Sequence, residues 1–192
     1  VTDPPRSPPS VTVSDSQRWA AVGRLLHDDT IRRKTRIAGL LTLLFAQPLS
    51  RIVALRSSQI SISDDHAVHV VFAAIPIQMP PLLDDLIREH LEQQCESRYT
   101  PSHTGWLFPG RLPGTHLSTE NIRTQLVAVG VKPYEHRKAA LFQLASDMPA
   151  PVLAELLAIT TKNAAAWAKL AARDWTDYVT ERGRSMPHRR RS

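Results

Sequence analysis

Two short basic runs offer the clearest chemistry in this 192-residue sequence. The first is Arg-Arg-Lys-Thr-Arg at residues 32–36, and the second is His-Arg-Lys at residues 136–138. Guanidinium and ammonium groups at this density could donate charge-assisted hydrogen bonds to the phosphates of a nucleic acid. The first run could equally form the solvated face of a helix. Phosphate binding is therefore the first function to examine, with a structural role beside it.

The net charge of +6 is only weak evidence that the folded part of the chain binds nucleic acid. Five arginines within residues 182–192 supply five of the six charges, because no acidic residue lies among them. We predict that this segment is a basic, disordered tail, which would add salt-sensitive affinity for any polyanion. Without the tail the chain is nearly neutral, so specific contacts must come from local clusters.

Other kinds of site are poorly represented. The single cysteine, Cys95, cannot form an internal disulfide, and no neighbouring histidine or acidic pattern indicates catalysis. The histidines lack the spacing of metal ligands, so we expect neither a metal nor another cofactor. The longest apolar run, residues 37–46, is too short to cross the roughly 30 Å of a bilayer core, and no secretory signal is present. We expect a cytoplasmic, nucleoid-associated protein with no membrane partner.

Apolar periodicity predicts an α+β, mainly helical fold. Residues 1–16 hold four prolines among serines and threonines, which predicts an interdomain linker of a longer protein, and residues 17–181 would form one domain. Three short strands are predicted to form an antiparallel sheet with the proline-containing strand at an edge: 60–62, 68–72 and 75–77. Helices are predicted at about 15–27, 31–46, 49–55, 82–91, 119–129, 137–146, 152–159, 163–172 and from 174 onward.

Four short sequence motifs occur in a recognisable order along these elements. They are FAQPLSRIVALR at residues 45–56, IPIQMP at 75–80, WLFPG at 106–110 and YEHR at 134–137. In amino-acid sequence and in order these motifs resemble those of the catalytic domain of the tyrosine recombinases, the phage-integrase family. The resemblance covers residues 14–181 and implies the same α+β, mainly helical fold with a small three-stranded antiparallel sheet.

That resemblance implies a chemistry in which a tyrosine attacks a DNA backbone phosphate and forms a 3′-phosphotyrosyl intermediate. Two arginines stabilise the phosphorane, a lysine and histidines move protons, and no metal is required. By this resemblance Arg137 is the retained second arginine of the H-x-x-R box. Pro48 stands at the first arginine, Tyr134 stands at the histidine of the box, and the turn at 72–74 carries no lysine.

The last two catalytic positions are altered as well. Residues 157–159 (LAI) replace an L-G-H turn, and Trp167 or Ala168 falls where the tyrosine nucleophile belongs. Loss of a single charged stabiliser typically costs 10²–10³ in rate. The resemblance therefore implies the DNA-binding domain of a recombinase-like or integrase-like protein that has lost catalysis.

An active recombinase is the alternative. It would break and rejoin DNA strands with Arg51, one helical turn past the lost arginine, and with Tyr178 as a displaced nucleophile, about ten residues beyond the expected position. Arg137 also has a structural alternative, since a salt bridge to Glu135 or Asp147 could occupy it.

For DNA binding, we expect the helices that open at Ser118 and Tyr134 to face the duplex. Five side chains would contact phosphates: Arg123, Lys132, His136, Arg137 and Lys138. Such contacts position a protein on double-stranded DNA without reading its sequence.

Two other binding functions stay open. Residues 152–170 could form a helix-turn-helix unit, although the Ala-Ala-Ala-Trp of its second helix suits packing better than contact with base edges. The domain could instead be a protein-interaction module. It would dock to a recombinase partner, or to a second copy of itself, through Trp167, Trp175 and the C-terminal helix.

Overall fold

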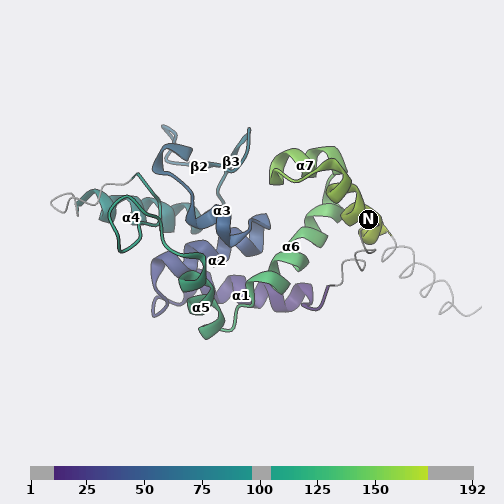
Figure 1. The fold of residues 1–192 in the computed structure, drawn as a ribbon, viewed down its shortest axis with the longest axis horizontal. Helices are drawn as coiled ribbons and strands as arrows, with labels where there is room; N and C mark the ends of the chain where they lie inside the picture. The colour runs from purple at the N-terminus through teal and green to yellow at the C-terminus, as the bar shows by residue number, and fades with distance from the viewer. Residues whose placement is uncertain (1–10, 97–104, 173–192) are drawn as a thin grey trace, which may run out of the picture.

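The structure, a computed structural model, describes residues 11–96 and 105–172. Its helices and strands are α1 (Asp15–His27), α2 (Arg33–Phe45), α3 (Leu49–Val53), β1 (Ile60–Ile62), β2 (Val68–Val71), β3 (Pro76–Gln78), α4 (Leu83–Glu96), α5 (Thr119–Ala128), α6 (Pro133–Asp147) and α7 (Ala150–Leu157). A further helix covers residues 161–172. The predicted α+β, mainly helical class is confirmed (Figure 1).

The first helix begins where its capping residues predict. The Ser14 hydroxyl accepts a hydrogen bond from the backbone N–H of Gln17, and the Gln17 side chain accepts one from the backbone N–H of Ser14. Trp19 of this helix is 52% exposed, with the Arg18 guanidinium 4.8 Å from its ring. Arg18 instead turns inward and donates to the Leu43 carbonyl, which leaves the tryptophan outside.

The sheet has the predicted topology. Its strands are antiparallel in the order β1-β2-β3, with Ile60 opposite Val70 and Val70 opposite Ile77. The proline of β3 therefore lies in an edge strand, where its missing N–H costs no central ladder bond. Val68 and Val70 of β2 are fully buried, since that face of the sheet packs toward α4.

Apolar side chains gather in two clusters. The larger one joins α1, α2, α4, α5 and the sheet, and the smaller one joins the second half of α6, α7 and helix 161–172. Helix α2 is central, since it contacts α1, α4, α5 and α6. A Cβ on Gly39 would lie 2.5 Å from a Leu25 methyl and 2.9 Å from a Leu126 methyl, so glycine allows α1 and α5 to approach α2 closely.

Several helix boundaries differ from the prediction. Helix α1 has the predicted bounds, which overlap the last two residues of the predicted linker 1–16. Helix α6 begins at Pro133 rather than Arg137, because proline at the first helical position needs no hydrogen-bond acceptor. The predicted tail 182–192 lies outside the described residues, as does the helix predicted from Asp174. In Figure 1, α6 runs from the side of α1 and α5 toward α7.

The stability of this fold should depend on pH through His90. Burial lowers the pKa of His90, whose Nε2 lies 2.9 Å from the Leu107 carbonyl oxygen and whose ring lies near Phe108. The unfolded chain therefore takes up the proton first, near the ordinary histidine pKa of about 6.5. Urea titrations should show stability falling as the pH drops below about 6.5. Part of that fall should be absent from His90→Gln, and identical pH profiles would contradict the assignment.

Candidate nucleic-acid interface

A groove lies between the end of α2, α5 and the start of α6, with a volume of about 520 Å³. We call it the α5–α6 groove. Its lining includes Pro48, Leu49, Arg123, Val127, Lys132, Pro133, Tyr134, Glu135 and Arg137. The fold thus brings residues 48–49 beside residues 123–137. Pro48 and Tyr134, which the resemblance places at catalytic positions of the family, line the same groove as Arg137.

Arg137 is held at the wall of the groove by a backbone contact. Its Nε donates to the carbonyl of Ala46, the left-handed residue that ends α2, at 2.7 Å. Burial, and then the nearby Arg51 charge, lowers the pKa of Arg137 below that of a free guanidinium. Among the described residues it forms neither the salt bridge to Glu135 nor the one to Asp147. Its Nη atoms have no hydrogen-bond partner in the described part of the chain.

Arg51 contacts the C-terminal end of α7. Its Nη1 donates to the Leu157 carbonyl at 2.6 Å and to Gln47 Oε1 at 2.9 Å, and its Nη2 lies 3.4 Å from the Ala158 carbonyl. Ala158 is the left-handed residue that ends α7, so Arg51 caps that C-terminus. The structure therefore places Arg51 against α7 and not in the lining of the α5–α6 groove.

The other cations lie on both sides of the groove. Arg123 is about half exposed and bonds to Glu120, whose carboxylate raises the pKa of Arg123. Lys132 is exposed at the N-terminus of α6. The Lys138 ammonium lies 4.4 Å from the centre of the Tyr134 ring, a cation–π contact.

His136 does not belong to this exposed set. It is only 5% exposed, and its Nδ1 lies 2.9 Å from the carbonyl oxygen of Lys132. It borders a different recess with Gln17 and Arg24, on the α1 side of α6. The prediction of a phosphate contact by His136 fails for this reason: with α6 starting at Pro133, residue 136 turns toward α1.

Trp167, which the resemblance places at the position of the tyrosine nucleophile, is not in the groove lining. Trp167 is 6% exposed in the smaller apolar cluster, together with Leu157. Trp175 and Tyr178 lie outside the described residues. In helix 161–172, Ala164 and Ala171 are also buried, whereas the polar side chains of Lys162, Asn163 and Lys169 are exposed.

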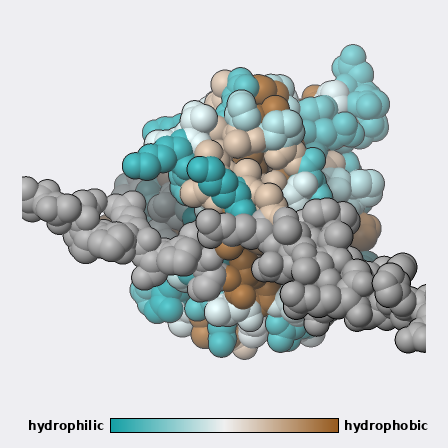
Figure 2. All heavy atoms as spheres, turned by 90° about the vertical axis from the view of Figure 1, so that its right-hand side faces the viewer, coloured by the Kyte–Doolittle hydropathy of each residue, from teal (hydrophilic) through white to brown (hydrophobic). Residues whose placement is uncertain are grey.

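The same cluster bears on docking to a partner protein. Since Trp167 packs within the chain, its indole is not available at the surface for such a partner. Figure 2 views the molecule from the side of α7, where hydrophobic atoms reach the surface. Val152, a large apolar residue of α7, is 50% exposed.

The basic residues of the first run, 32–36, have different roles in the structure. Arg36 is buried and bonds to the Leu25 and Leu26 carbonyls and to Asp29, while Arg33 pairs with Glu89 at 2.9 Å. Among the described residues, Arg32 and Lys34 are the basic members of the run that remain for a ligand. Sequence reasoning missed the Arg36 role, for which the sole signal was an arginine inside an otherwise apolar helical stripe.

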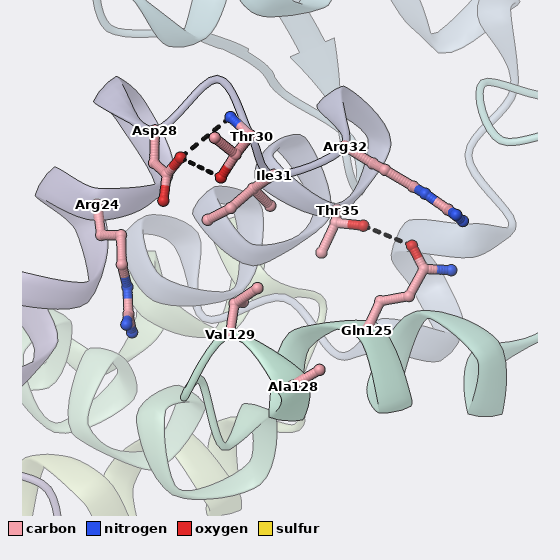
Figure 3. A pocket seen from close by; sticks show the side chains of 9 residues that line it. All are labelled: Arg24, Asp28, Thr30, Ile31, Arg32, Thr35, Gln125, Ala128 and Val129. Carbon is pink, nitrogen blue, oxygen red and sulfur yellow. Dashed lines mark hydrogen bonds between the residues drawn. The ribbon is translucent and has the colours of Figure 1, made fainter.

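Arg32 borders a second recess, of about 360 Å³, on the other side of α5 (Figure 3). There the Thr35 hydroxyl donates to Gln125 Oε1 at 2.7 Å, and Asp28 accepts two bonds from Thr30. Arg24 and Arg32 extend to opposite sides of the recess in Figure 3, so their charges do not converge on one point.

Within 11–96 and 105–172, no three histidine, cysteine, aspartate or glutamate side chains are grouped so that they could hold a metal ion. No helix in these two stretches combines the length and apolarity needed to cross a membrane.

A scan against protein-family models finds no match, and a search of the curated proteins finds none either. Solved structures do match. XerA recombinase has a TM-score of 0.62 at 13% identity, over 99% of this chain and 68% of XerA. XerH site-specific recombinase bound to difH substrate, a pre-cleavage complex, has a TM-score of 0.64 at 12% identity, over 87% of this chain and 53% of XerH. A post-cleavage complex of XerH with palindromic difH gives 0.67 at 8% identity, over 91% and 53%.

These identities are low, so the likeness concerns the fold. The chain spans about half the length of XerH and about two thirds of XerA. Together with the observed order of helices and the three-stranded sheet, the matches confirm the resemblance inferred from the sequence phrases. The chain therefore has the fold of a tyrosine site-specific recombinase domain.

Proposed function

We propose that this chain binds double-stranded DNA through the α5–α6 groove and does not cleave it. One observation carries the proposal: Arg123, Lys132 and Arg137 line a single groove at the place where the resemblance puts the recombinase active site. The XerH neighbours are bound to a DNA substrate, which supports DNA as the ligand class.

The electrostatics of the groove suit a backbone phosphate. Glu120 is paired with Arg123, which leaves Glu135 as the acidic side chain in the groove lining. Lys132 stands at the N-terminus of the 15-residue helix α6, whose dipole also favours an anion there. Arg137 lines the same groove, so several donors meet in one place.

The chemistry needed for strand cleavage has no support in the described residues. Proline at position 48 cannot stabilise a phosphorane, and Tyr134 cannot act as the histidine of an H-x-x-R box does. Arg51, the substitute arginine, is committed to the α7 carbonyls. Trp167 is buried and indole is not a nucleophile toward phosphate.

The binding half of the proposal predicts a difference between two lysines. Lys132→Gln should weaken the affinity for a generic duplex about three- to tenfold, because it removes one charge-assisted phosphate contact. Lys162→Gln is the matched control, since Lys162 is exposed in the same way but lies outside the groove lining. Fluorescence anisotropy would measure both dissociation constants. Equal losses would show that the groove is not the contact surface.

The cleavage half is tested on DNA substrates that carry a nick and trap a covalent intermediate. The chain should bind such substrates and yield no covalent protein–DNA adduct on denaturing gels. An adduct that disappears in Tyr178→Phe would overturn the proposal and establish the active alternative.

A further inference from the structure

The α5–α6 groove is lined by apolar side chains as well as by cations, and the binding of a phosphate alone would not need the apolar ones. Apolar side chains line it from three elements: Pro48 and Leu49 after α2, Val127 on α5, and Tyr134 on α6. Val127 is 47% exposed and Tyr134 is 65% exposed. Two large apolar side chains thus remain open to solvent in the same groove, flanked by cations.

Tyr134 is arranged as a stacking platform. The Lys138 ammonium lies 4.4 Å from its ring centre, and the residue as a whole is 65% exposed. The side chain belongs to the first turn of α6, which fixes its backbone. Aromatic rings of this kind stack with nucleobases, an interaction that tolerates any base because every base has a π-face.

The groove lining combines cations with an apolar wall, and a nucleotide likewise combines a charged phosphate with a flat base. Lys132 and Arg137 flank Tyr134 in sequence and line the groove with it, so a phosphate on the cations would leave its base near the ring. A volume of about 520 Å³ lies within the range of small-ligand sites, roughly 300–1,000 Å³. A base inside a duplex is stacked and cannot enter such a groove, whereas an unpaired base can.

We propose that the α5–α6 groove holds one unpaired nucleotide of DNA, with its base against Tyr134 and Val127 and its phosphate on Lys132 and Arg137. This inference rests on the proposed function, because it takes DNA as the ligand. Binding would then favour DNA with a bulged or unpaired nucleotide over a fully paired duplex. The groove would recognise a distortion of DNA and would not require a particular base.

The test compares three DNAs by fluorescence anisotropy: a paired duplex, the same duplex with one unpaired thymidine, and the same duplex with one abasic bulge. The abasic bulge keeps the flexibility of the DNA and removes only the base. We expect the thymidine bulge to bind about 5- to 50-fold more tightly than the abasic bulge. Tyr134→Ala should abolish this difference and Tyr134→Phe should keep it. Tyr134 is mostly exposed, so neither variant should impair folding.

The outcomes separate the two proposals. Equal affinity for the thymidine and abasic bulges, or a preference that survives Tyr134→Ala, would overturn the nucleotide site while leaving duplex binding intact. Absence of binding to all three DNAs would overturn the proposed function, and the nucleotide site with it.

Discussion

Trp167→Ala is expected to lower the free energy of unfolding by about 3–5 kcal/mol. The indole is 6% exposed and sits in the smaller apolar cluster among Leu153, Leu157 and Ala164. Its removal takes away a large apolar area and leaves a cavity that α6 and α7 cannot fully close. Urea denaturation followed by circular dichroism would measure the loss.

The matched control is Trp19→Ala, because Trp19 is 52% exposed. It should change stability by about 0.5 kcal/mol or less. Equal losses at the two tryptophans would contradict the placement of Trp167. Trp167→Tyr should not produce a covalent DNA adduct either, since the hydroxyl would be buried at a site away from the α5–α6 groove.

Arg36→Met is expected to lower the free energy of unfolding by about 2–4 kcal/mol. The Arg36 guanidinium is 7% exposed and donates to the Leu25 carbonyl at 2.7 Å and to the Leu26 carbonyl. These are carbonyls at the end of α1 that have no helical partner, so methionine would leave them without a donor. Methionine keeps much of the side-chain volume, which separates the loss of hydrogen bonds from a loss of packing.

Asp29→Asn is the control for the ion pair in this contact. Its side chain is 91% exposed, so the pair with Arg36 is screened by solvent, and stability should stay nearly unchanged. If Asp29→Asn cost as much as Arg36→Met, the ion pair and not the helix cap would be the stabilising contact.

Local signals made much of the fold predictable. The Ser14 capping box, the alternation at residues 60–62 and 68–71, and the left-handed glycine at 130 each depend on neighbours in sequence. The order of elements was equally clear, and it carried the resemblance to the recombinases that the solved structures confirm. The α5–α6 groove was predicted in part, since four of the five expected DNA-contacting residues lie in it or beside it.

The rest could not be read from spacing, because it depends on which way each side chain turns. Arg36 and His136 belong to basic runs yet are buried, and each is turned inward by the register of its helix against α1. Arg51 was considered as a catalytic substitute, but its guanidinium reaches the α7 carbonyls, 106 residues away in sequence. Long-range contacts of this kind leave no periodic signal in the chain.

The most direct test of DNA binding by the domain itself is a salt series of duplex affinities. The chain would be compared with and without residues 182–192, and the shortened chain with and without Arg137→Ala, after circular dichroism has verified folding. We predict a steep dependence of log K on log salt that survives removal of the tail. Arg137→Ala should make that slope shallower by about 0.9, the value for one phosphate contact. Loss of binding with the tail, or a slope unaffected by Arg137→Ala, would contradict the account.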